Sequence, residues 1–209
     1  MRNLNVLEDI GNLFTAVNVY LDLRRQTRDR SFPDVRTLVT REQIAATGAR
    51  NVTFVQFELT SYNTFFELEA VVGDVTVLAD AADQSTFAFR DGVLFETRGF
   101  GDDIIKADMF EVPPNLARGA GTHSREYTYL GGDADIESIV FECEVSTRPQ
   151  EQVTIMGLRY TTQPIIETCE LNDYIFQNEY WRDLRTGVFV RSAQWVSPVI
   201  ERIVFEVIN

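Results

Sequence analysis

The sequence predicts a mainly β fold, either one large antiparallel β-barrel or two packed antiparallel sheets. Apolar and polar residues alternate along most segments after residue 50, which is typical of antiparallel strands with one buried face. Short turn pairs, such as Asp91-Gly92, separate these segments. The 209 residues include 15 Phe and 7 Tyr, residue types that favour sheets. No linker interrupts the chain, so we expect a single β-rich domain over residues 1–209.

Two helices are predicted before the strands. Apolar residues recur at steps of three and four over residues 4–24, namely at Leu7, Ile10, Leu13, Phe14, Val17 and Leu21. This stripe predicts an amphipathic helix that packs on the sheet or, as the alternative, docks on a partner. Thr40 and Gln43 form a capping-box pattern, which predicts a second, short helix that ends at Gly48.

About eleven strands are predicted from residue 50 to residue 208. Residues 85–90 and 93–98 form the clearest hairpin, because Asp91-Gly92 suits a type I′ turn. Residues 152–162 are predicted to form one strand. Residues 99–121 are predicted to be irregular apart from a turn of helix, and to be the segment most suited to a functional loop.

Charge and hydropathy exclude several classes of function. The formal net charge is -13, so the chain repels phosphate backbones and nucleic acid is not expected as a main partner. The same charge disfavours adhesion to an anionic lipid surface. No run of eighteen apolar residues occurs, so no transmembrane helix is predicted.

Two cysteines, Cys143 and Cys169, each lie within a strand-like segment. A disulfide between neighbouring strands would close a loop of about 25 residues and stabilise the fold by roughly 3 kcal/mol. Two buried free thiols are the alternative. We favour the disulfide, which implies an oxidising compartment.

Catalytic and metal centres have little support in the sequence. His123 is the only histidine, so a Ser-His-Asp device would have to use it and a three-histidine metal site is impossible. Gly99-Phe100-Gly101 lacks the third glycine of a dinucleotide-binding fingerprint. Acidic pairs such as Asp102-Asp103 are expected to be solvated turn residues. We therefore predict no catalytic residue, no metal and no cofactor.

Four sequence blocks occur in an order that indicates a family. They are TREQIA at residues 40–45, FRDGVL at 89–94 running into TRGFGDD at 97–103, YTYL at 127–130, and FQNEYW at 176–181 with VRSAQWV at 190–196. The series covers about residues 38–208. It resembles the YjbF/GfcB-type lipoproteins, which are associated with exopolysaccharide production and group 4 capsule formation in Gram-negative bacteria.

The resemblance implies a β-rich protein that faces the periplasm, is anchored in the outer membrane by a lipidated N-terminal cysteine, and has no established catalytic activity. No cysteine lies near residue 1, so the lipidation site is missing either from this sequence or from the protein itself, and we expect the anchor in the full-length precursor. We therefore predict a non-enzymatic accessory factor in capsule or exopolysaccharide secretion or assembly, which binds glycan or export-machinery proteins. A ligand-binding β-barrel for a lipid or oligosaccharide and a glycan-processing hydrolase are the alternatives.

Three places are candidates for the binding surface. They are the turn after residue 89, the loop at residues 98–103, and the tryptophans that flank the C-terminal hairpin, because tryptophan and arginine together stack on sugars and on partner surfaces. Tryptophans of a β core are the alternative for the third place. The candidate binding residues are Arg90, Asp91, Arg98, Asp102, Asp103, Trp181, Arg191 and Trp195.

Overall fold

Thirteen antiparallel strands and three short helical segments make up the described part of the computed structural model, which covers residues 32–80, 84–101, 103–130 and 136–209. The predicted helix over residues 4–24 and the candidate residue Asp102 lie outside these ranges. The prediction of a mainly β, antiparallel fold is confirmed.

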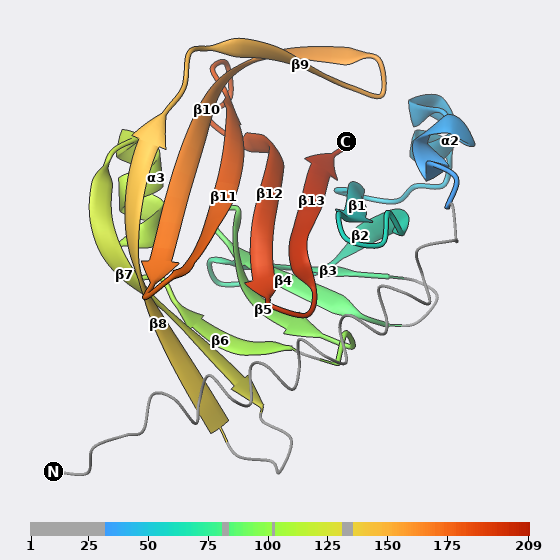
Figure 1. The fold of residues 1–209 in the computed structure, drawn as a ribbon. Coiled ribbons are helices and arrows are strands. Elements are labelled where there is room, and N and C mark those ends of the chain that lie inside the picture. Colours follow the sequence, from blue (N-terminus) through green and yellow to red (C-terminus); the bar gives the residue numbers. More distant parts are fainter. Residues whose placement is uncertain (1–31, 81–83, 102, 131–135) are drawn as a thin grey trace, which may run out of the picture.

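The elements follow one another in the order shown in Figure 1. The helical segments are η1 (Val35–Thr37), α2 (Arg41–Ala46) and α3 (Val112–Arg118). The strands are β1 (Thr53–Phe57), β2 (Asn63–Val72), β3 (Val75–Ala79), β4 (Thr86–Arg90), β5 (Val93–Arg98), β6 (Ile104–Asp108), β7 (Gly121–Leu130), β8 (Ile136–Thr147), β9 (Glu151–Ile155), β10 (Leu158–Leu171), β11 (Tyr174–Asp183), β12 (Phe189–Ser197) and β13 (Glu201–Val207).

The sheet curls into a nearly closed barrel, which decides between the two predicted architectures. Its strand order is β5-β4-β3-β2-β1-β13-β12-β11-β10-β8-β7-β6, and β9 pairs with β10 beside this path. The first strand pairs with the last, with Thr53 opposite Val207. At the two ends of the order, the N–H of Ile104 in β6 donates to Oγ1 of Thr97 in β5 at 2.9 Å. The two end strands of the sheet, β5 and β6, therefore lie close together and nearly close the barrel.

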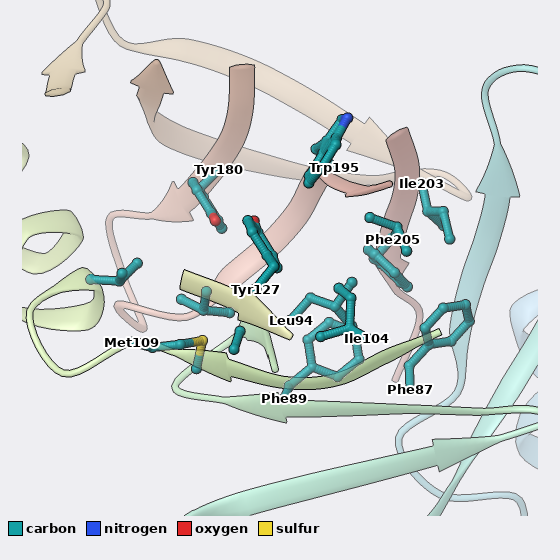
Figure 2. Close-up of a cluster of buried hydrophobic side chains, with 14 of the residues drawn as sticks. Phe87, Phe89, Leu94, Ile104, Met109, Tyr127, Tyr180, Trp195, Ile203 and Phe205 are labelled. Atoms are coloured by element: carbon teal, nitrogen blue, oxygen red, sulfur yellow. The ribbon is translucent and has the colours of Figure 1, made fainter. Parts of the chain in front are cut away.

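Aromatic and aliphatic side chains fill the barrel interior. Figure 2 shows Trp195 and Phe205 on one wall facing Phe87 and Phe89 on the other. Phe87 and Phe205 meet edge to face with ring centroids 5.1 Å apart, and Trp195 stacks on Phe176 at 4.3 Å. Such pairs add about 0.5–1.5 kcal/mol each beyond the area that they bury. The high Phe content therefore serves this interior.

A smaller apolar cluster covers the outside of the barrel near α2. Phe54, Ile155 and Val190 are buried there together with Ile44 of α2. The β9–β10 hairpin arches over one end of the barrel toward α2 in Figure 1. The guanidinium of Arg41 holds the two together by donating to the carbonyls of residues at the hairpin turn, at 2.9 and 3.1 Å.

Local signals place α2 and the β4–β5 turn as the sequence predicts. Oγ1 of Thr40 accepts from the N–H of Gln43, and Oε1 of Gln43 accepts from the N–H of Thr40. Asp91 and Gly92 have φ values of 51° and 79°, as a type I′ turn requires. A Cβ on Gly92 would lie 2.8 Å from a ring carbon of Phe189, so this position also needs glycine for close packing.

The prediction that residues 99–121 are largely irregular is wrong, because they contain both β6 and α3. Pro113 and Pro114 stand in the first turn of α3, where the backbone N–H groups have no intrahelical acceptor and proline costs little. Gly119, with φ of 71°, ends the helix in the left-handed conformation. The prolines start this helix instead of preventing it.

The prediction of one strand over residues 152–162 is also wrong. The chain turns at Met156-Gly157, which separates β9 from β10, and β10 then continues through Pro164. One edge of β10 pairs with β11, and the strand that pairs with its other edge changes along the chain. The last pair with β9 is Thr162 with Glu151, and pairing with β8 begins at Ile165. Proline cannot donate to a ladder, so it is tolerated where β10 exchanges partners.

The disulfide between Cys143 and Cys169 is present, as predicted. The two residues lie directly opposite each other on β8 and β10, with Cα atoms 4.0 Å apart. Both side chains belong to the barrel interior. The link therefore fixes the register of two central strands.

Replacing both cysteines, Cys143→Ala with Cys169→Ala, should lower the free energy of unfolding by about 3 kcal/mol, because the crosslink no longer restricts the unfolded chain. Urea titration followed by tryptophan fluorescence measures this loss. Dithiothreitol should produce a similar loss in the wild type and none in the double variant. If the wild type and the double variant have equal free energies of unfolding without dithiothreitol, the expectation is contradicted.

Candidate functional site

The candidate residues Arg90 and Asp91 lie at the β4–β5 turn. Nε of Arg90 is 2.8 Å from a carboxylate oxygen of Asp74 in the neighbouring β2–β3 turn. The Arg90 guanidinium also lies over the ring of Phe95, 4.7 Å from its centroid. This turn therefore offers an arginine that is held in place by an ion pair and a ring.

Arg98 and Asp103 shape the β5–β6 connection, where the barrel closes. Nη1 of Arg98 donates to the carbonyls of Thr97 and Ile104 at 2.7 and 3.1 Å. The carboxylate of Asp103 accepts from the Thr97 hydroxyl at 2.8 Å and from the N–H of Gly99 at 3.0 Å. The predicted loop is therefore held by its own charged residues.

Trp181 and Arg191 lie together on the outer face of the barrel, opposite each other on β11 and β12. The Arg191 guanidinium stacks over the indole at 4.8 Å, and Nε1 of Trp181 donates to the carboxylate of Glu151 at 2.5 Å. The structure therefore places these two candidate residues side by side, in contact with each other and with Glu151.

Trp195 is separated from that pair because it points into the barrel and is 2% exposed. The β11–β12 ladder ends at Glu179 opposite Ala193, and the side chain of Asn178 then accepts from the N–H of Trp195 at 2.6 Å. This irregularity turns both Gln194 and Trp195 inward. Strict alternation in the sequence gives no sign of it.

A buried charged network that the sequence did not predict spans the interior. Glu167 of β10 and its partners Arg125 and His123 of β7 have no exposed side-chain surface. One oxygen of Glu167 is 2.6 Å from Nη1 of Arg125 and accepts from Nδ2 of Asn178 at 2.6 Å. The other oxygen lies 2.8 Å from Nε2 of His123. The carboxylate therefore has three nitrogen partners and, at 3.3 Å, the hydroxyl of Tyr180.

The network also joins opposite walls of the barrel. Oε1 of Gln194 accepts from the N–H of Leu94 in β5 at 2.7 Å and from the hydroxyl of Tyr180 at 3.3 Å. Nε2 of Gln194 donates to the carbonyl of Gly92 at 3.0 Å, and Nη2 of Arg125 lies 3.4 Å from the carbonyl of Leu94. The β4–β5 hairpin is thus tied to β7 and β12 from the inside.

Electrostatics keep this ion pair charged. Burial by itself would raise the pKa of Glu167, but Arg125 and the hydrogen bonds from His123 and Asn178 lower that pKa to about 2. Burial would lower the pKa of Arg125, and Glu167 outweighs this effect and raises it well above its ordinary value. Glu167 is therefore a carboxylate at any physiological pH, which suits a structural role and not that of a proton donor.

A metal-like grouping occurs in the same place but offers no vacant ligands. Ligand atoms of His123, Cys143 and Glu167 lie within 4.8 Å of one another. The sulfur of Cys143 is in the disulfide and cannot become a thiolate while that bond exists. The other two residues are bonded to each other.

Two hollows on the surface of the described part of the chain are open to a ligand. The first, of about 310 Å³, lies between the β1–β2 turn and the β5–β6 loop and is lined by Phe32, Phe57, Thr60, Tyr62, Thr64, Phe66, Asp80, Ser85 and Phe100. The second, of about 440 Å³, lies beside α3 and is lined by Phe110, Glu111, Pro114, Asn115, Arg118, Gly121 and Thr122. Only the first hollow combines several aromatic rings with a polar wall.

Comparison with known families assigns the chain. A family model described as group 4 capsule polysaccharide lipoprotein gfcB, YjbF matches residues 29–208. The chain belongs to the YjbF family. No curated protein matches the sequence. Within the described residues, no helix of this YjbF-family protein is long and apolar enough to cross a membrane.

A solved structure shares the fold of this YjbF-family chain. The crystal structure of the hypothetical lipoprotein YmcC from Escherichia coli (K12) matches with a TM-score of 0.70. The match has 16% sequence identity and covers 86% of this chain and 98% of YmcC. At this identity the similarity establishes the fold and not the ligand.

Glu167→Gln should destabilise this YjbF-family protein by about 3–5 kcal/mol, because Arg125 would remain buried without an anion. Urea titration measures the loss. The matched control is Glu142→Gln on the exposed face of β8, which should change the free energy of unfolding by less than about 0.5 kcal/mol. Adding Arg125→Met to Glu167→Gln should recover part of the lost stability. Equal losses of stability in Glu167→Gln and in the control Glu142→Gln would contradict this role of Glu167.

Acid should remove a defined part of the stability. The pKa of Glu167 is about 2 in the folded protein and 4.5 ordinarily, so its contribution is complete above pH 4.5 and is lost as the pH falls from 4.5 to 2. This difference between the folded and ordinary pKa values of Glu167 corresponds to about 3 kcal/mol of folding stability. Unfolding free energies measured across this range should fall more steeply for the wild type than for Glu167→Gln, and parallel curves would refute the assignment.

Proposed function

We propose that this protein is a non-enzymatic accessory factor in the secretion or assembly of capsule or exopolysaccharide. The observation that carries the proposal is the family match over residues 29–208, which covers nearly all of the chain. A location on the periplasmic side of the outer membrane, with a lipid anchor in the full-length precursor, agrees with the lipoprotein family. The Cys143–Cys169 disulfide supports the same oxidising compartment.

The protein acts by binding glycan or export-machinery proteins through its outer surface. The Trp181–Arg191 pair is the first candidate contact, because it combines an aromatic ring and a guanidinium, two groups that are enriched at binding surfaces, on the outer face of the barrel. The Arg90–Asp91 turn and the 98–103 loop, which includes Asp102, are the other two. Trp195 contributes from the interior by supporting the strand that carries Arg191. Nucleic acid is not among the partners, given the net charge of -13.

Two observations favour this role over a ligand-binding barrel or a glycan hydrolase. The barrel interior is filled by packed side chains, which argues against an enclosed lipid or oligosaccharide. A glycosidase needs a protonated carboxyl group as its acid, and Glu167 is held as a carboxylate by Arg125. A buried ionic network of this kind supports a rigid scaffold better than a reaction centre.

Deleting the gene in the bacterium that encodes the protein should reduce surface polysaccharide several-fold, and the wild-type gene should restore it. Trp181→Ala should restore it less well, because the indole contact is removed. Leu184→Ala, a change of an exposed apolar residue in the turn after β11, is the control and should restore it fully. Surface polysaccharide is measured by immunoblot or by uronic-acid and hexose assays.

The non-enzymatic part of the proposal has its own readout. Isolated polysaccharide should keep its chain-length distribution during long incubation with the purified protein, as followed by size-exclusion chromatography. Shortened chains would overturn that part. A deletion strain with normal surface polysaccharide would overturn the proposed function as a whole.

A further inference from the structure

We propose that the hollow between the β1–β2 turn and the β5–β6 loop binds one neutral sugar unit of the glycan. This inference rests on the proposed function and assigns a specific site to it. The hollow measures about 310 Å³, which is at the small end of the range for ligand sites and suits one or two sugar rings.

An unbroken series of aromatic rings forms one side of the hollow. The ring of Phe100 lies 5.6 Å from that of Phe57, which lies 6.0 Å from that of Tyr62. Phe32 completes the series, edge to face with Tyr62 at 5.4 Å. Tyr62 is 41% exposed, so part of this platform faces solvent. A cluster of rings that remains open at the surface of a charged protein is typical of a binding site.

The platform is rigid before any ligand arrives. Phe100 stacks on the buried ring of Phe87 with centroids 4.6 Å apart and an interplanar angle of 19°. The carboxylate of Asp103 accepts from the N–H of Phe100 at 3.3 Å, which fixes the loop that carries this ring. A Cβ on Gly99 would lie 3.1 Å from Cα of Ser85, so the loop packs closely against the opposite wall. Binding therefore costs little ordering of the protein.

The other side of the hollow is polar. Thr60, Thr64, Asp80 and Ser85 line it, and the hydroxyl of Thr64 donates to the carboxylate of Asp80 at 3.2 Å. Hydroxyl and carboxylate oxygens bond well to the hydroxyl groups of a sugar. An acyl chain has no hydroxyl groups with which to use the polar oxygens of this wall, and an anionic sugar would be repelled by Asp80.

A pyranose ring matches both walls at once. Its C–H face carries a slight positive charge and stacks on the negative face of an aromatic ring. Its equatorial hydroxyls point outward in the ring plane, toward the polar wall. The residues come from three connections between strands, from β1 and β2, and from the segment before η1, and the fold alone brings them together. The ligand class that this combination selects is a neutral sugar.

The test uses the full chain and two kinds of probe. The first is a set of oligosaccharides released by mild acid from the surface polysaccharide of the same bacterium. The second is a panel of glucose, galactose, mannose and N-acetylglucosamine. Saturation-transfer difference NMR detects binding, and isothermal titration calorimetry gives the affinity for the oligosaccharides.

Tyr62→Ala should weaken oligosaccharide binding about tenfold or more, because it removes the exposed part of the platform. Phe110→Ala is the matched control: Phe110 is an exposed aromatic residue of the second hollow, 90% accessible, and its loss should leave the affinity unchanged. Phe57→Leu is a second variant that keeps the apolar packing but removes a ring. Circular dichroism and urea titration verify that each variant is folded.

The remaining outcomes separate this inference from the proposed function. Sugar binding that survives both Tyr62→Ala and Phe57→Leu overturns the assignment of the hollow and leaves a glycan-binding role intact. Absence of binding to every sugar probe also overturns the assignment of the hollow. In that case the gene-deletion experiment, which measures restoration of surface polysaccharide, still tests the proposed function independently. Binding of sodium laurate, but not of sugars, at Tyr62 would make the hollow an acyl-chain site and overturn the inference.

Discussion

The buried ion pair between Glu167 and Arg125 is the interaction on which the rest of the barrel depends. A carboxylate and a guanidinium without exposed surface are tolerated only if other groups complete their hydrogen bonds. His123 and Asn178 complete those of the carboxylate. Glu167 lies on β10, its partners Arg125 and His123 lie on β7, and Asn178 lies on β11. Only one relative arrangement of these three strands therefore gives the carboxylate all of its partners. The pair therefore specifies the packing of the barrel as well as occupying its interior.

The disulfide and the ion pair reinforce each other. Cys143 stands opposite Cys169 on one side and opposite His123 on the other. Glu167 lies two residues before Cys169 on the same face of β10, so the crosslink also sets the distance from Glu167 to His123. A slip of one residue would turn Glu167 to the outside and leave Arg125 without its anion. A covalent link and an electrostatic constraint thus select the same strand register.

The sequence predicts those features that depend on neighbouring residues. Alternation identified most strands, and the Thr40–Gln43 capping box and the Asp91-Gly92 turn were placed correctly because each is a contact over two or three residues. Features that depend on distant partners were missed. Glu167 is 42 residues from Arg125, and no local pattern marks either as buried. The inward position of Trp195 likewise depends on Asn178, a residue of another strand.

The same limit explains why the hollow could not be predicted as a unit. Phe100 belongs to the predicted 98–103 loop, but Tyr62 lies in the β1–β2 turn and Phe32 lies before η1, and neither carries a motif. Closure of the sheet between β5 and β6 brings Phe100 to Phe57. The barrel interior is filled by packed side chains, so the proposed recognition of a glycan or a protein has to take place at the outer surface. A filled and electrostatically fixed barrel is suited to hold such surface rings in a constant geometry, and this is what a binding factor without its own chemistry requires.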